Sequence, residues 1–106
     1  MTVKLVVIYP RPNDIEAFER VYNREHGPIA VAKLAGKTKI VATRVLGSPA
    51  AEPPYHRIAE FYFPSMEALE QCAASEGGKQ TIGNGVSISS GGAPVFLVAE
   101  EETFVF

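Results

Sequence analysis

The chain has 106 residues, a formal net charge of −2 and 46% hydrophobic residues, which is typical of one globular domain over residues 1–106. The charge argues against nucleic acid or an anionic membrane surface as a main partner, and no apolar run approaches the roughly 20 residues of a membrane span. No signal peptide is recognisable and the single cysteine, Cys72, cannot form an internal disulfide, so we expect a cytoplasmic protein.

The first predicted element is a strand over residues 3–9. This run is apolar except for Lys4, is rich in β-branched residues, and is stopped by the prolines at positions 10 and 12. Because its apolar residues do not alternate with polar ones, we expect this strand to be buried on both faces.

An amphipathic helix is predicted over residues 13–26. Phe18, Tyr22 and His26 recur at four-residue spacing and therefore lie on one face of this helix. The glycine and proline that follow His26 predict that the helix ends there, because proline removes a backbone hydrogen bond and glycine favours a helix terminus.

Beyond this stop, the pattern predicts a short helical piece over residues 29–34 and then two strands. The strands cover residues 39–46 and 55–63, and the second of them is rich in alternating aromatic residues. The segment between them, residues 47–54, is a loop by its content of proline and small residues.

A second helix is predicted over residues 65–74, where Ser65 can cap the first turn and apolar residues recur at helical spacing. Residues 75–92 contain six glycines and four serines, so we expect only a short irregular helix followed by a loop. The last strand is predicted over residues 94–100, and the chain ends in an exposed apolar tail.

The predicted order of elements is strand, helix, strand, strand, helix, strand, which is the ferredoxin-like βαββαβ pattern. This α+β fold implies a four-stranded antiparallel sheet with the helices on one face. The first and last strands are apolar on both sides, so the other face of the sheet should also be covered. At this chain length a second copy is the simplest cover, and we expect a homodimer that packs through this sheet face.

Five features occur in order along the chain: VKLVVIYPRP at residues 3–12, Phe18 and Tyr22 before HGPI at 26–29, YHRIAE at 55–60, FPSMEAL at 63–69, and the glycines at 91 and 92. In this order they resemble the EthD family of the dimeric α+β barrel superfamily. The resemblance implies the fold and dimer expected above, with a pocket for a small, mostly cyclic molecule between sheet and helices. EthD-like proteins accompany the oxidative breakdown of an ether, which implies a role in xenobiotic degradation. Relatives include small isomerases, cyclases and cofactor-free monooxygenases.

His26 is the leading candidate for a catalytic residue. An imidazole at the edge of a pocket titrates near neutral pH and suits proton abstraction or donation. At a helix C-terminus the helix dipole favours the charged ring, whereas burial opposes it. The alternative is a histidine that hydrogen-bonds the last carbonyl groups of the helix and holds the turn.

His56 and Glu60 lie four residues apart on the third predicted strand, so we expect them on one face of the sheet. A carboxylate among apolar residues needs a partner, which His56, Arg44 or His26 can supply. Functionally, His56 would assist catalysis while Arg44 and Glu60 bind polar groups of the substrate. Structurally, the same residues would form a buried ion pair or a dimer contact.

Four aromatic residues are expected to line a site for a flat apolar ligand, namely Tyr9, Phe18, Tyr22 and Tyr62. Aromatic residues at such spacing also occur in ordinary cores, and this alternative applies most strongly to Phe18. The chain has no residue spacing typical of a metal site, a phosphate loop or a dinucleotide site, and no cofactor is predicted.

Three functions are compatible with these residues. The first is a cofactor-free enzyme in which His26, assisted by Tyr22 or His56, transfers a proton on a small cyclic or carbonyl compound. The second is a non-catalytic accessory protein that binds a hydrophobic small molecule or a partner oxygenase. The third is haem or dioxygen chemistry with His26 or His56 as an iron ligand, as in other dimeric α+β barrels.

Overall fold

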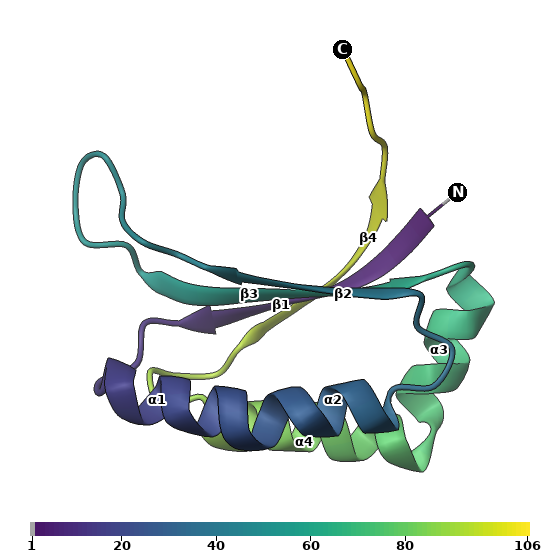
Figure 1. The fold of residues 1–106 in the computed structure, drawn as a ribbon, viewed down its shortest axis with the longest axis horizontal. Helices are drawn as coiled ribbons and strands as arrows, with labels where there is room; N and C mark the ends of the chain where they lie inside the picture. The colour runs from purple at the N-terminus through teal and green to yellow at the C-terminus, as the bar shows by residue number, and fades with distance from the viewer. Residues whose placement is uncertain (1) are drawn as a thin grey trace.

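The structure is a computed structural model and describes residues 2–106. Its elements are β1 (Thr2–Pro10), α1 (Ile15–Val21), the π-helical turn η1 (Tyr22–His26), α2 (Gly27–Lys33), β2 (Lys39–Arg44), β3 (Tyr55–Phe63), α3 (Met66–Ala74), α4 (Glu76–Ile88) and β4 (Val95–Glu101). The four strands form one antiparallel sheet in the order β2-β3-β1-β4, with all helices on one side of it (Figure 1). This arrangement confirms the predicted ferredoxin-like α+β fold.

The helical layer consists of two rows that lie side by side. α1, η1 and α2 form one continuous row, and α4 lies along it with α3 at one end (Figure 1). The side chains of Asp14, Ser65 and Ser75 accept hydrogen bonds of 3.0 to 3.1 Å from backbone N–H groups in the first turns of α1, α3 and α4. Local sequence therefore sets where these three helices begin. Within residues 2–106, no helix has the length and apolar character needed to cross a membrane.

The predicted helix end after His26 is wrong, because the chain continues through Gly27 and Pro28 in helical conformation. In the π-helical turn, the Gly27 N–H donates to the carbonyl oxygen of Tyr22, five residues earlier. Pro28 then occupies the first turn of α2, where a missing backbone N–H costs little. The Gly-Pro pair thus changes the hydrogen-bonding pattern of the helix without ending it.

α4 also differs from the prediction, since a helix of 13 residues replaces the short irregular one. Its glycines are explained by close contacts with neighbouring backbone. A Cβ at Gly77 would lie 2.2 Å from the carbonyl oxygen of Lys33, and one at Gly78 would lie 1.9 Å from that of Cys72. The glycines therefore allow α4 to pack closely on the ends of α2 and α3, whereas glycine content alone favours a loop.

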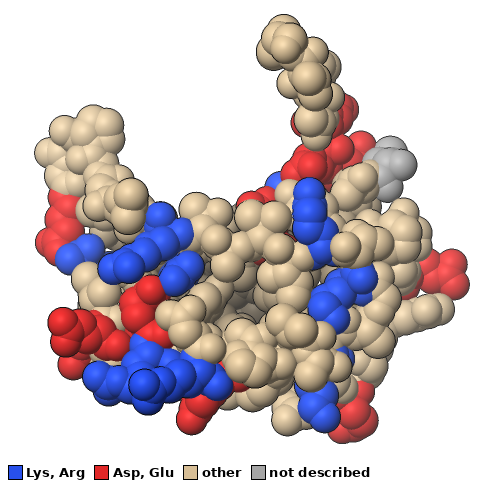
Figure 2. All heavy atoms as spheres, in the orientation of Figure 1, with Lys and Arg blue, Asp and Glu red and all other residues tan. Residues whose placement is uncertain are grey.

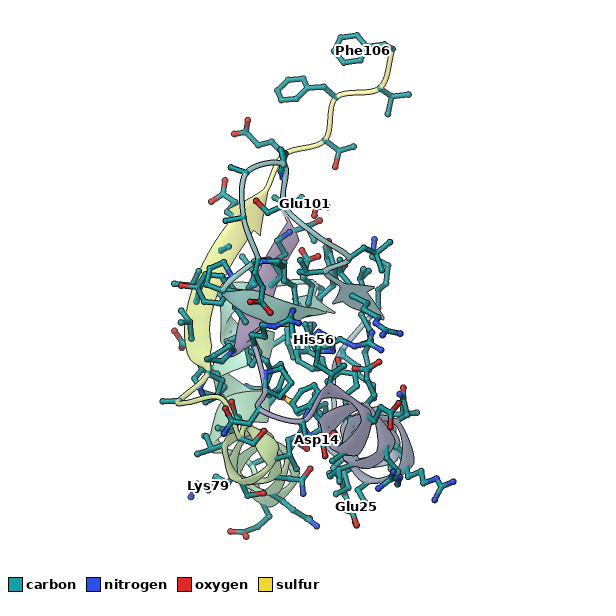
Figure 3. All side chains as sticks on the ribbon, turned by 90° about the vertical axis from the view of Figure 1, so that its left-hand side faces the viewer. Asp14, Glu25, His56, Lys79, Glu101 and Phe106 are labelled. Atoms are coloured by element: carbon teal, nitrogen blue, oxygen red, sulfur yellow. The ribbon has the colours of Figure 1, made fainter. Side chains whose placement is uncertain are left out.

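A β-bulge in β3 decides which face of the sheet several candidate residues occupy. The pairing of β1 with β3 skips His56 at the step from Tyr9 to Pro10, so His56 is an extra residue in β3. His56 is buried between the sheet and the helices (Figure 3), whereas Glu60 lies on the opposite face. The expectation that these two residues share a face is wrong, because the bulge breaks the two-residue alternation of the strand.

The open face of the sheet, opposite the helices, is largely apolar. Its partly or fully exposed apolar residues include Val6, Ile8, Val41, Ile58, Val95 and Leu97. One polar cluster interrupts this surface: Lys4 contacts Glu60 and lies 3.0 Å from Glu101, and the Tyr62 hydroxyl donates to Glu101 at 2.6 Å. Glu60 and Tyr62 therefore do not join the other candidate site residues, because even-numbered residues of β3 beyond the bulge point away from the helices.

Two segments project from the sheet on the side opposite the helices. One is the loop over residues 45–54, and the other is the tail after β4, which ends at Phe106 (Figures 1 and 3). Phe104, Val105 and Phe106 are highly exposed, as the sequence predicts. Both projections rise beside the open face and flank it.

Candidate functional site

His26 is buried at the end of η1 and is only 4% exposed. Its Nδ1 lies 2.9 Å from Asn84 Oδ1, and its Nε2 lies 3.2 Å from the hydroxyl oxygen of Tyr9. Because a carboxamide oxygen can only accept, Nδ1 carries the hydrogen of the neutral ring and donates it to Asn84. Nε2 then keeps its lone pair and accepts from Tyr9.

Burial lowers the pKa of His26, while the hydrogen bond to Asn84 acts in the opposite direction. The neutral ring therefore predominates at neutral pH, with a basic nitrogen at Nε2. The expected support of the charged form by a helix C-terminus does not apply, since His26 lies inside a continuous helical row. Burial likewise raises the pKa of Tyr9, so its hydroxyl stays protonated and acts as a donor.

α4 reaches this histidine because residue 85 is glycine. A Cβ at Gly85 would lie 2.8 Å from Tyr9 Oη and 3.3 Å from His26 Cε1. The bare backbone at this point brings the preceding residue, Asn84, into hydrogen-bonding contact with the imidazole. Asn84 is absent from the predicted site residues because an asparagine between two glycines is equally typical of a turn.

A cavity of about 510 Å³ lies beside His26, between the η1–α2 segment and strands β2 and β3. Its lining is mainly apolar and consists of Tyr22, Asn23, His26, Gly27, Pro28, Ala30, Val31, Ile40, Ala42, Ala59 and Phe61. Small organic ligands typically occupy cavities of roughly 300–1,000 Å³ with few polar groups in the wall. The volume and lining of this cavity suit such a ligand.

Three of the four predicted aromatic residues do come together. Tyr9, Phe18 and Tyr22 pack with the His26 ring as one cluster in which neighbouring ring centroids lie 5.4 to 6.2 Å apart. Tyr22 and His26 line the cavity, whereas Tyr9 and Phe18 lie behind them in the core. Tyr62 is on the other face of the sheet, as described above.

A second polar cluster joins α1 to the bulge of β3. Arg57 donates hydrogen bonds of 2.7 and 2.9 Å to the Glu19 carboxylate, and His56 Nε2 lies 3.1 Å from it. The hydrogen bonds from Arg57 lower the pKa of Glu19. The Arg57 guanidinium also lies 4.7 Å from the centre of the Tyr22 ring. This cluster positions Tyr22 at the cavity wall, and His56 belongs to that support, not to the cavity lining.

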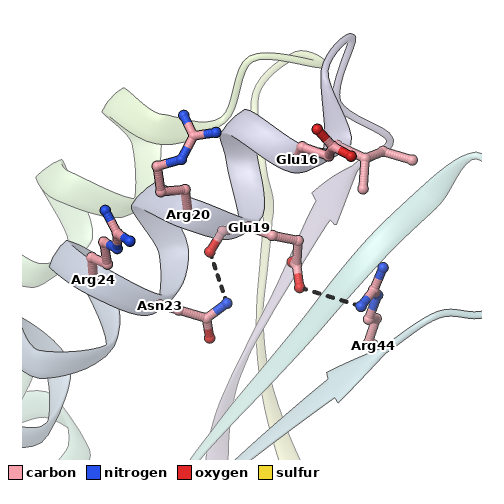
Figure 4. A pocket seen from close by; sticks show the side chains of 7 residues that line it. Glu16, Glu19, Arg20, Asn23, Arg24 and Arg44 are labelled. Carbon is pink, nitrogen blue, oxygen red and sulfur yellow. Dashed lines mark hydrogen bonds and ion pairs between the residues drawn. The ribbon is translucent and has the colours of Figure 1, made fainter.

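Arg44 lies in an open groove of about 400 Å³ between α1 and the edge of the sheet (Figure 4). Its side chain is 52% exposed, and its guanidinium approaches Glu19 only to 3.9 Å. Arg20 and Arg24 line the same groove. Figure 2 shows basic side chains gathered in this region, over α1 and the neighbouring end of the sheet.

The two histidines belong to separate clusters, one with Tyr9 and Asn84 and the other with Glu19 and Arg57. Within the part of the chain that the structure describes, no three His, Cys, Asp or Glu side chains are arranged to hold a metal ion. Of the two histidines only His26 lines the cavity, and its hydrogen-bond partners Tyr9 and Asn84 hold its ring without lining the cavity themselves.

A family model described as the EthD domain matches residues 11–87. Among curated proteins, an uncharacterised 11.0 kDa protein from the thcB–thcC intergenic region of Rhodococcus erythropolis is similar to this chain. It is 24% identical over 98 residues, which cover 92% of this chain and 94% of that protein.

Several solved structures share this fold, and one of them is an EthD family protein. An EthD family protein from Bacillus halodurans is 29% identical with a TM-score of 0.88, covering 96% of this chain and 100% of its own. A dimeric ferredoxin-like protein of unknown function from Jannaschia sp. CCS1 is 17% identical, with a TM-score of 0.72 and coverage of 95% and 100%. SnoaB, a cofactor-independent oxygenase from Streptomyces nogalater, shares the fold at 12% identity, with a TM-score of 0.68 and coverage of 98% and 96%. Since the family model spans well over half of the sequence, the chain belongs to the EthD family, as its sequence features predict.

Proposed function

We propose that the protein binds a small, largely apolar cyclic or carbonyl compound in the cavity beside His26 and that His26 transfers a proton on this compound without a cofactor. One observation carries the proposal: a neutral imidazole, with its tautomer set by Asn84, forms part of the wall of an apolar cavity. A base of this kind must present a lone pair to the substrate and stay uncharged at neutral pH. The lowered pKa of His26 and the hydrogen bond to Asn84, which leaves the lone pair on Nε2, support this role.

The proposed reaction uses Nε2 of His26. Its 3.2 Å contact with the Tyr9 hydroxyl is long for an O–H···N hydrogen bond, so we propose that a small turn of the His26 ring presents Nε2 to the substrate while Tyr9 stays in place. When Nε2 accepts a proton from a carbon next to a carbonyl group, the Nδ1–H bond to Asn84 keeps the charged ring oriented. The apolar surroundings disfavour the charged ring, so the proton returns to a second atom of the same molecule. The net reaction is an isomerisation, in which a proton moves from one atom of the compound to another and no electrons are gained or lost.

A second function is favoured by the same hydrogen bonds. Both ring nitrogens of His26 have partners, as they would if the histidine served only to join β1 to α4. The protein would then bind a hydrophobic small molecule as a non-catalytic accessory protein in an oxidative degradation system. The two functions differ in whether a bound compound exchanges protons with the protein.

Hydrogen–deuterium exchange separates these functions without knowledge of the natural substrate. Cyclic ketones and lactones are incubated with the protein in D2O, and binding and exchange next to the carbonyl group are followed by NMR. We expect exchange at least about 100-fold above buffer for the unchanged protein, since general base catalysis contributes this much. His26→Gln should abolish exchange while the fold remains, and Gln80→Ala, an exposed change on α4, should leave it intact.

Binding without exchange would identify an accessory protein and reject the proton-transfer role. Compounds that neither bind nor exchange, across rings of several sizes, would reject the cavity as a ligand site. Loss of the fold in His26→Gln would favour the purely structural role of the histidine, and Asn84→Ala then tests the base by a change in exchange rate alone.

We also infer that two copies pack through the open face of the sheet. The strand pairing places the apolar residues of that face on the side away from the helices. The loop over residues 45–54 and the exposed tail lie on the same side (Figure 1). A protein of the same fold is described as dimeric, which supports the inference. In such a dimer the cluster of Lys4, Glu60 and Glu101 would lie within the interface and fix the register of the two sheets.

A further inference from the structure

We propose that the groove beside α1 binds a carboxylate of the same molecule whose apolar part occupies the cavity beside His26. The ligand class is then an amphipathic cyclic carboxylic acid. This inference rests on the proposed function, because the apolar part of the molecule needs that cavity.

The groove and the cavity are neighbours that share one residue. Asn23 lines both, and its Nδ2 donates a hydrogen bond of 2.7 Å to the carbonyl oxygen of Glu19 (Figure 4). This bond holds the Asn23 side chain at the border between the two spaces. In the proposed complex, one molecule extends from the apolar cavity past Asn23 into the groove.

In the part of the chain that the structure describes, two of the three arginines of the groove have no acidic partner, and the third has only a long contact with one. Among residues 2–106, neither Arg20 nor Arg24 lies within 4.0 Å of a carboxylate, and Arg44 reaches Glu19 only at 3.9 Å. The Glu19 carboxylate is already bound twice by Arg57, at 2.7 and 2.9 Å. The negative charge of Glu19 is therefore compensated by Arg57, which does not line the groove.

Glu16 is the second carboxylate of the groove. The three arginines therefore outnumber the two carboxylates that line it. Positive charge thus accumulates at one place on a chain whose formal net charge is −2. A guanidinium group presents parallel N–H donors that match the two oxygens of a carboxylate. The alternative, a merely hydrated basic helix surface, also attracts an acid over a neutral compound of the same shape, but through net charge and not through these particular arginines.

The test compares such pairs directly. 1-Naphthaleneacetic acid and cyclohexaneacetic acid are titrated into the protein beside their primary amides, and the dissociation constants are measured by NMR. We expect each acid to bind about tenfold more tightly than its amide at low ionic strength, with a smaller preference at high salt. Arg20→Gln combined with Arg44→Gln should remove the preference and leave the affinity for the amide unchanged. Lys79→Gln combined with Lys33→Gln removes two exposed positive charges outside the groove and serves as the matched control for the double arginine variant (Figure 3 labels Lys79).

The outcomes separate the groove from the cavity. Equal affinities for acid and amide, or a preference that survives in the double arginine variant, would overturn the carboxylate site and leave the proposed function standing. If neither member of any pair binds, the cavity itself is rejected, and the groove loses its ligand with it. A preference lost equally in the double lysine variant would show a general effect of net charge and would also overturn the site.

Discussion

Replacing Gly85 by alanine tests whether α4 packs directly on the Tyr9–His26 pair. A Cβ at Gly85 would lie 2.8 Å from Tyr9 Oη, whereas a Cβ at Gly83 would meet nothing within 4 Å. The Tyr9 side chain is 1% exposed and held on all sides, so it cannot rotate away from an added methyl group. We expect Gly85→Ala to destabilise the protein and Gly83→Ala to stabilise it.

The magnitude follows from a comparison of the two variants. Both gain the helix propensity of alanine, about 0.8–1 kcal/mol, and this gain cancels in their difference. The remaining term is the overpacking of one methyl group in a filled site, which costs about 1–3 kcal/mol. The free energy of unfolding of Gly83→Ala should therefore exceed that of Gly85→Ala by about 1–3 kcal/mol. For a chain of this size, each kcal/mol corresponds to roughly 4–8 °C in Tm.

Denaturant titrations at one fixed protein concentration measure this difference, since the stability of a dimer depends on concentration. The ring signals of His26 in NMR spectra give a second readout, which should move in Gly85→Ala and stay in place in Gly83→Ala. Equal stabilities together with unmoved His26 signals would refute the close approach of α4 to the histidine and, with it, the geometry of the proposed site.

Three further predictions concern charge and assembly. Glu19→Gln should lower the free energy of unfolding by about 1.5–3 kcal/mol at neutral pH, because Arg57 loses a charged acceptor. Since the folded-state pKa of Glu19 is lowered, this contribution is complete above the ordinary carboxyl pKa and disappears as the pH falls through the lowered value. Urea titrations at stepped pH measure it, and a pH-independent difference would contradict the assignment. Leu97→Asp should yield a monomer in light scattering, because Leu97 lies on the open face of the sheet. Val86→Asp on α4 should leave the dimer intact, although Val86 is as exposed as Leu97, at 48%. If both variants remain dimers, the open sheet face is excluded as the interface. His26 should titrate below the ordinary histidine range in NMR, and Asn84→Ala should lower its pKa further, because the hydrogen bond to Asn84 raises it. The lowered pKa also means that the folded state loses stability as the pH falls from the unfolded-state value through the folded-state one, and an unshifted titration would contradict the burial argument.

Simple periodicity was sufficient to predict the order of elements and the sheet. The alternation of β3 and the helical spacing after Ser65 each report burial on one face, and each depends only on neighbours in the sequence. α4 could not be predicted this way, because its glycines are required by carbonyl groups of Lys33 and Cys72 that are distant in sequence. Asn84 contacts His26 only because α4 is a helix packed on η1, and this packing leaves no local signal in the sequence.

Three irregular features that sequence periodicity does not predict lie near the cavity beside His26: the π-helical turn, the β-bulge at His56 and the glycine at position 85. The π-helical turn carries Tyr22 and His26 to the cavity wall, and the bulge at His56 forms the cluster behind Tyr22. A π turn, a bulge and a mid-helix glycine such as Gly85 each cost stability relative to regular structure. A chain that needed only a stable core would gain from regular elements and from a packing of α4 that does not require glycine at position 85. The convergence of three such costs on the surroundings of His26 therefore favours a ligand site over packing alone as the reason for this geometry.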